Sequence, residues 1–385
     1  MMVATVAVCT LTAGCGGDAG VDLSSLDVGT YSTAVRTIAD QPSLPNGIVL
    51  EGIRMSDAVA DTSQFGSQLN HLWQAGPIVD TASIAPVVGE AGSRVLDRTG
   101  WVAGYRATYA DAPHDRDDGG GPPSHVELSI MLLRFADHAA ATAAASALEA
   151  ASWTDLSNTI AAPLPRRPEI AARYTPGTGA LRLNTPVGPF VLRLALEAPP
   201  DGIEKRIGEL DAAVDREFAL LRDFTPTPIA DIPSLPRDPD GLLARMVATD
   251  PAGPPPPSAT FAVYGPTGAL RDQSPAIRAA RQYDKWGVDR LAVSGNQQLY
   301  LLRDKESAKE MAAEFAARAD GSEREIDGDP GVPDTRCFQT KAPAAGIPGY
   351  TCRMVYDDVY TAIRADTASN VKQMAAAQYA LLATR

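Results

Sequence analysis

The chain has 385 residues, of which 45% are hydrophobic, and this composition predicts two folded domains of ordinary size. The formal net charge of −13 argues against nucleic acid as a partner, because phosphate backbones repel an acidic surface. It also argues against charge-driven adhesion to anionic lipid headgroups, so a covalent lipid is the membrane attachment that we expect. Arginine strongly outnumbers lysine among the 34 basic residues, which is typical of a GC-rich genome such as that of an actinobacterium.

The N-terminus resembles the export signal of a lipoprotein. Residues 1–15 carry no charge, and an apolar run at 3–11 leads into the sequence LTAGC, which ends at Cys15 and resembles a lipobox. We expect a signal peptide over 1–15, acyl chains such as palmitate on Cys15, and a flexible tether over 16–30. The mature protein would then lie on the extracytoplasmic face of the cell membrane. The alternative is a frayed apolar N-terminus of a cytoplasmic protein.

The segment 31–224 is predicted to form an N-terminal α+β domain whose first part has no assignable elements. Alternating and β-branched patterns predict its strands, and alanine-rich or 3.6-periodic patterns predict its helices. The strands are expected at 103–111, 125–135, 170–174, 180–184 and 190–197, and the helices at 136–151 and 203–221.

Proline clusters make 225–257 a stiff connector, after which a C-terminal domain over 258–385 repeats the same order. Strands are expected at 288–294, 298–303, 335–341, 350–356 and 359–364, and helices at 305–319 and after Asp366, a candidate N-cap. A gapless alignment sets Arg134 onto Arg303 and continues through the following helices. We infer a duplicated α+β unit in which helices cover one face of a mostly antiparallel sheet.

Cys337 and Cys352 lie in two strand-like segments joined by a connection rich in proline, glycine and alanine. A disulfide across a hairpin is the simplest interpretation, and it is consistent with an oxidising compartment. The alternative is a pair of reduced, buried cysteines.

Sequence motifs for catalysis are absent. The four histidines, His71, His114, His125 and His138, have no metal-ligand spacing, and no nucleophile elbow or phosphate-binding loop occurs. We therefore assign no catalytic residue and expect no metal and no cofactor.

Two other groups of residues are candidates for binding. Asp115, Asp117 and Asp118, in the acidic stretch 111–121, begin like a calcium loop but lack its later ligands, so a solvated loop is the favoured interpretation. Aromatic faces could also bind a sugar or a lipid, but core packing is favoured for the tryptophans. These are Trp73, Trp101, Trp153 and Trp286.

Four segments together resemble a family of actinobacterial lipoproteins of unknown function. They are LDVGTY at 26–31, EGIRM at 51–55, YGPTGAL at 264–270 and GVDRLAVSG at 287–295. The resemblance implies a two-part envelope lipoprotein and supplies no activity.

The leading expectation is a non-enzymatic lipoprotein that binds an envelope protein, a cell-wall polymer or a lipid, in a cleft between the two units. One alternative is a carrier of envelope lipids in an apolar cavity. Another is a cell-wall hydrolase whose paired carboxylates the sequence does not locate.

Overall fold

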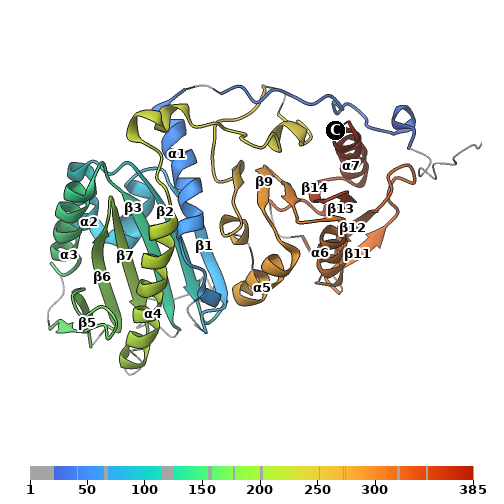
Figure 1. Cartoon of the computed structure of the whole chain (residues 1–385). Coiled ribbons are helices and arrows are strands. Elements are labelled where there is room, and N and C mark those ends of the chain that lie inside the picture. Colours follow the sequence, from blue (N-terminus) through green and yellow to red (C-terminus); the bar gives the residue numbers. More distant parts are fainter. Residues whose placement is uncertain are drawn as a thin grey trace, which may run out of the picture.

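The computed structural model contains two seven-stranded antiparallel sheets, each flanked by helices (Figure 1). It describes residues 21–40, 42–64, 68–113, 125–154, 158–176, 178–199, 203–250, 252–271, 273, 275–318, 321–343 and 346–384. The expected signal peptide, Cys15, and the part of the acidic stretch from residue 114 onward lie outside the described residues. The α+β class is confirmed.

The N-terminal unit is built on the sheet β1-β2-β3-β7-β6-β5-β4. Its strands are β1 (His71–Ile78), β2 (Ala103–Ala110), β3 (Glu127–Arg134), β4 (Ile160–Ala161), β5 (Ala172–Thr175), β6 (Ala180–Val187) and β7 (Phe190–Glu197). Its helices are α2 (Ala85–Thr99), α3 (His138–Ser152) and α4 (Ile203–Asp223).

The C-terminal unit is built on the sheet β11-β12-β13-β14-β10-β9-β8. Its strands are β8 (Phe261–Tyr264), β9 (Arg290–Ser294), β10 (Gln297–Leu301), β11 (Glu323–Ile326), β12 (Thr335–Thr340), β13 (Tyr350–Tyr356) and β14 (Val359–Ala365). Its helices are α5 (Ala276–Trp286), α6 (Lys305–Arg318) and α7 (Ala368–Ala383). Strand order and helix positions match those of the N-terminal unit element by element, as a duplication predicts.

Equivalent hydrogen bonds show which residues of the two repeated units correspond. The backbone N–H group at the third position of α3 donates to the capping carboxylate of Asp137, and that of α6 donates to Asp304, each at 2.8 Å. The gapless alignment instead sets Asp137 opposite Glu306, so it is wrong by two residues. Alanine repeats produced that slip, because alanines match one another at several offsets. In α7 the capping side chain also differs from the expectation, since it belongs to Thr367 rather than Asp366.

Helices cover both faces of each sheet, so the expectation of one covered face is wrong. In β3, Leu132 packs in the core beneath α4, and Leu133 packs in the core beneath α2 and α3. In the C-terminal unit, α5 and α6 cover one face and α7 covers the other. Strands buried on both faces need apolar residues throughout, which explains the continuous apolar run of β3.

The N-terminal residues pack on the C-terminal unit before the chain enters the N-terminal unit (Figure 1). Leu26 is buried in a core formed with α7, and the backbone N–H of Arg36 donates to the carbonyl of Ala244 at 3.2 Å. Residues 21–30 are therefore not the expected flexible tether, and residues 31–40 lie along the C-terminal unit. Burial of apolar side chains such as Leu26 holds this segment in place.

The proline-rich connector also packs into the fold. It contains two short 3₁₀ helices at Ile229–Ser234 and Leu243–Arg245. Ile232 and Leu243 are fully buried. The Val247 backbone N–H donates to the side chain of Gln378 in α7, and its carbonyl accepts from the side chain of Gln297 in β10. The connector thus stabilises the arrangement of the two units.

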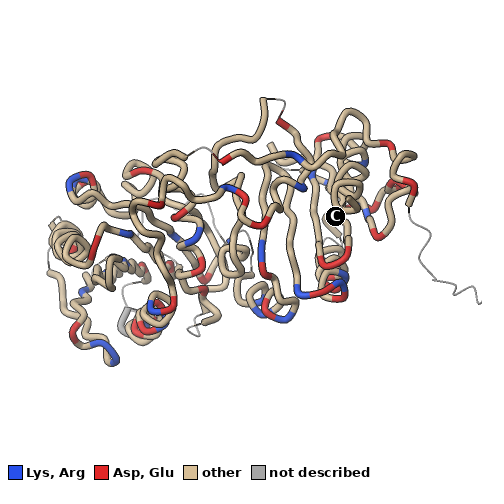
Figure 2. Tube along the Cα trace, turned by 45° about the horizontal axis from the view of Figure 1, so that its top comes forward, with Lys and Arg blue, Asp and Glu red and all other residues tan. Residues whose placement is uncertain are grey.

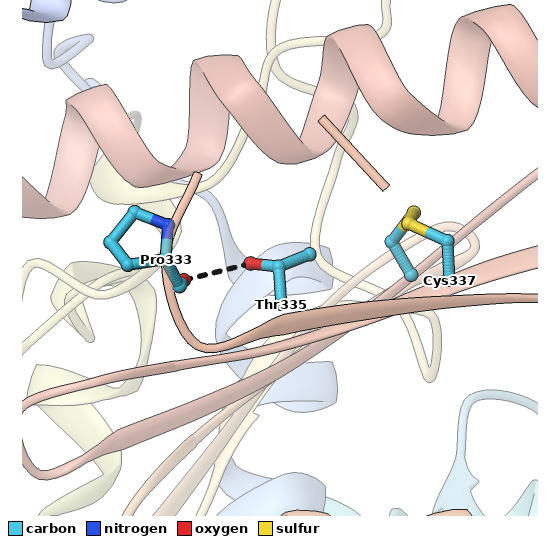
Figure 3. Close-up of a disulfide and its surroundings, with 4 residues drawn as sticks. Pro333, Thr335 and Cys337 are labelled. Atoms are coloured by element: carbon cyan, nitrogen blue, oxygen red, sulfur yellow. Dashed lines mark hydrogen bonds between the residues drawn. A yellow bond between two sulfur atoms is a disulfide. The ribbon is translucent and has the colours of Figure 1, made fainter. Parts of the chain in front are cut away.

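Cys337 of β12 and Cys352 of β13 lie directly opposite each other, and their sulfur atoms are at bonding distance. Figure 3 shows the disulfide at Cys337 and the nearby turn, where the Thr335 hydroxyl donates to the Pro333 carbonyl at 3.1 Å. Both cysteines are buried in the core beneath α7.

Candidate binding site at the junction of the two units

Helix α1 (Leu44–Met55) joins the two units. Met55 packs in the core of the N-terminal unit, and Ile53 packs in the core of the C-terminal unit. Close approach to the helix is possible because it contains glycines: a Cβ at Gly47 would lie 2.0 Å from the Ile232 carbonyl oxygen of the connector. A single helix is thus enclosed by both units and by the connector.

The buried carboxylate of Glu51 is the centre of a charged network on α1. It forms ion pairs with Arg54, on the next turn of the helix, and with Arg134, at the end of β3. The Thr227 backbone N–H and hydroxyl in the connector donate to the same carboxylate. Because the partners satisfy both oxygens, the fully buried charge is compensated.

A second carboxylate joins the end of α1 to the C-terminal unit. Asp57 accepts hydrogen bonds from the backbone N–H groups of Thr267 at 3.0 Å and Gly268 at 3.2 Å. Burial raises the pKa of Asp57, and these hydrogen bonds oppose that rise. A Cβ at Gly265 would lie 1.8 Å from the Asp57 Oδ2 atom, so glycine is required there for this contact.

The junction pocket, as we call the space beside these groups, has a volume of about 410 Å³. Residues from α1, the end of α4, the connector, β8 and β9 line it. Its apolar lining residues are Leu50, Ile53, Phe224, Leu235, Pro236, Pro239, Val263 and Gly265, and its charged ones are Arg54, Asp57, Arg237, Asp240 and Arg290. This volume is within the range of small-molecule sites, ~300–1,000 Å³. Guanidinium groups on apolar walls can bind an anion and contact an apolar group at the same time.

The tryptophans considered as binding residues lie outside this pocket. Trp153 and Trp286 are buried, Trp73 and Trp101 are half-buried, and none of the four lines the junction pocket. Asp111 accepts from the Val126 backbone N–H at 2.9 Å.

Among the described residues, no three side chains of His, Cys, Asp or Glu lie close enough to share a metal ion. In the same part of the chain, no helix combines the length and the apolar character that crossing a bilayer requires.

Two domain models of one family match almost the whole chain. The model described as the N-terminal domain of unknown function DUF7373 matches residues 38–237, and the C-terminal model of DUF7373 matches residues 242–385. The chain belongs to the DUF7373 family. This confirms the expected two-part family of unknown function. No curated protein and no solved structure matches the chain.

The junction pocket lies where the two DUF7373 domains meet. Pro239 and Asp240 fall between the residues matched by the two models. Three of the four segments that carried the sequence resemblance also contribute lining residues: Arg54, Gly265 and Arg290. These segments were the available signal for the site, but nothing in the sequence indicates that they lie next to one another in the folded chain.

Proposed function

We propose that this DUF7373 protein is a lipid-anchored, extracytoplasmic binding protein that holds a small ligand in the junction pocket. The observation that carries the binding role is the pocket itself, which both units, α1 and the connector line together. Sites at the meeting point of two domains are common in ligand-binding proteins. The role is non-enzymatic, and its setting is the cell envelope of an actinobacterium.

The lipobox-like sequence before Cys15 supports the anchor, and the Cys337–Cys352 pair supports an oxidising compartment. Five residues lie between Cys15 and Val21, so these two residues are at most about 20 Å apart. Because residues 21–30 pack on the C-terminal unit, that unit would face the membrane.

Lipidation is tested by metabolic labelling with an alkyne fatty acid in an actinobacterial host. The full chain should take up label and partition with membranes, and Cys15→Ser should lose both properties. Cys9→Ser is the matched control and should keep both. Equal labelling of all three chains, or label in none of them, would refute the anchor.

The binding role is tested by native and denaturing mass spectrometry of residues 16–385, which include the whole described fold, after export from the same host. A native mass that exceeds the denatured mass by one small-molecule increment supports the role. The increment should disappear in Val263→Trp, which fills the pocket from the edge strand β8. An increment that survives this substitution would place the ligand elsewhere.

A further inference from the structure

The charged groups of the junction pocket differ in how completely the protein itself neutralises them. Asp57 is held by two backbone N–H groups, and Asp240 pairs with Arg290 at 2.9 Å. The two carboxylates therefore have partners already. Arg237 and Arg290 retain unused capacity to donate hydrogen bonds.

Arg237 is the clearest case. It is only 8% exposed, and its guanidinium donates to the backbone carbonyls of Ala39 and Pro255. Its Nε atom is buried without a hydrogen-bond partner, and no described carboxylate forms an ion pair with it. The Asp40 carboxylate accepts from the Arg237 backbone N–H at 2.9 Å, but it forms no ion pair with the guanidinium. An anion in the adjoining pocket would therefore add a charged partner.

The surroundings of Arg237 add to this positive charge. The guanidiniums of Arg36 and Arg237 both lie over the ring of Phe261, with 5.7 and 5.6 Å to its centroid. Among the described residues, the Arg36 guanidinium donates to the Leu243 carbonyl. Burial lowers the pKa of Arg36, and the charge of Asp238 opposes that fall. Two like charges thus share one aromatic ring close to the pocket.

Arg290 and Arg54 contribute from the other sides. The Nε and Nη1 atoms of Arg290 donate to Asp240 and Asp289, and Nη2 has no partner among the described residues. Arg54 lies over the ring of Phe224, 5.5 Å from its centroid, next to the apolar wall. The arrangement combines donors for an anion with a surface for an apolar group.

We propose that the junction pocket binds an amphipathic anion, with a carboxylate or phosphate group near Arg237 and Arg290. Its apolar part lies against Leu50, Ile53, Phe224 and Val263. This inference rests on the proposed binding role. Basic and acidic residues are interspersed along both units (Figure 2), and the chain carries a net charge of −13. The overall electrostatic potential of the protein therefore does not attract an anion, and the hydrogen-bond donors in the pocket select it instead.

The test is isothermal titration calorimetry on residues 16–385 with ligands of one chain length. Decanoate and decyl phosphate are the anions, decanol is the neutral analogue, and decyltrimethylammonium is the cation. Acetate and inorganic phosphate test the anionic group alone. We expect both long-chain anions to bind at least about 10-fold more tightly than decanol, the cation to bind least, and the short anions not to bind measurably.

Arg290→Gln should reduce the affinity for decanoate about 10-fold and leave the affinity for decanol unchanged. The control is Arg94→Gln on α2, where 63% of the side chain is exposed, and it should behave as the wild type. An equal loss in both variants would mean that net charge alone matters, and it would overturn the proposal. Circular dichroism of each variant checks that the fold is retained.

These measurements separate the anionic character of the ligand from the binding role of the pocket. Equal binding of decanol and decanoate, or a preference for the cation, overturns the anionic class and leaves a binding pocket. If no probe binds but the exported protein carries another small molecule that Val263→Trp displaces, the class is again wrong and the binding role stands. If no probe binds and no such molecule is carried, both fall.

Discussion

Glu51 on α1 and Arg134 at the end of β3 form an ion pair in which both side chains are buried, and this pair fixes the helix that joins the two units. Thr227 of the connector donates to the same carboxylate, so three segments distant in sequence meet at one charge. Their convergence positions Arg54, which lines the junction pocket.

Removing this carboxylate should be strongly destabilising. Glu51→Ala leaves Arg134 buried without its counter-ion, and we expect a loss of ~3–5 kcal/mol in the free energy of unfolding, measured with urea. The matched control is Glu325→Ala, which breaks an exposed ion pair with Arg336 and should cost at most ~1 kcal/mol. Similar losses in the two variants would show that Glu51 has no special role.

Two helical glycines should respond oppositely to alanine. Gly47→Ala in α1 places a Cβ 2.0 Å from the Ile232 carbonyl oxygen, and backbone movement should cost ~1–3 kcal/mol or more. Gly208→Ala in α4 meets no atom within 4 Å and should stabilise the protein by ~0.5–1 kcal/mol, because alanine favours the helix. Thermal unfolding of both variants measures the difference, and a shift of the same sign in both would contradict this account of α1.

Glu217 of α4 should make stability depend on pH. It is fully buried, and burial raises its pKa from 4.5 to about 8, although its Oε1 atom accepts from the Ala60 backbone N–H at 2.7 Å. Between these two values the folded protein keeps a proton that the unfolded chain releases. The contribution of Glu217 to the free energy of unfolding is therefore fully present below pH 4.5. It falls as the pH rises towards about 8 and stays low above that pH.

Glu217→Gln removes this titration. The stability difference between wild type and variant should change by up to ~1.4 kcal/mol per pH unit within that window, in favour of the variant at high pH. Urea unfolding at several pH values measures it. Glu90→Gln, with 94% of the side chain exposed, is the control and should leave the pH profile unchanged. Parallel profiles for the wild type and Glu217→Gln would contradict the raised pKa.

Loss of the disulfide should destabilise the C-terminal unit. The bond closes a loop with a sequence separation of 15, and its removal in the double variant Cys337→Ser and Cys352→Ser should cost ~3 kcal/mol. Chemical reduction of the wild type should lower its thermal midpoint to about that of the double variant. A midpoint that reduction does not change would mean that the bond adds no stability.

The sequence by itself determined most elements with strong local signals. The β7 strand at Phe190–Glu197 and the β13 strand at Tyr350–Tyr356 have the predicted bounds, because their alternating or apolar patterns and flanking turns specify them locally. The α4 helix begins at the predicted residue for the same reason. The shared order of elements also established the repeated unit.

Other elements had weak local signals. Helix α1 contains Gly47 and Gly52, so its propensity is low, and packing between the two units stabilises it instead. The α2 helix was not predicted either, and its kink at Gly89 interrupts the helical pattern. The short β4, β8 and β11 strands lie at or near sheet edges and carry little periodicity.

Only the tertiary structure decided which residues form the junction pocket. Arg54, Arg237 and Arg290 are separated by long stretches of chain, and each stands alone in the sequence without a motif that indicates binding. Local patterns report whether a residue lies on a strand or a helix, and on which face. They do not report that a helix is enclosed by two sheets, because burial between units depends on contacts that form only when the whole chain has folded.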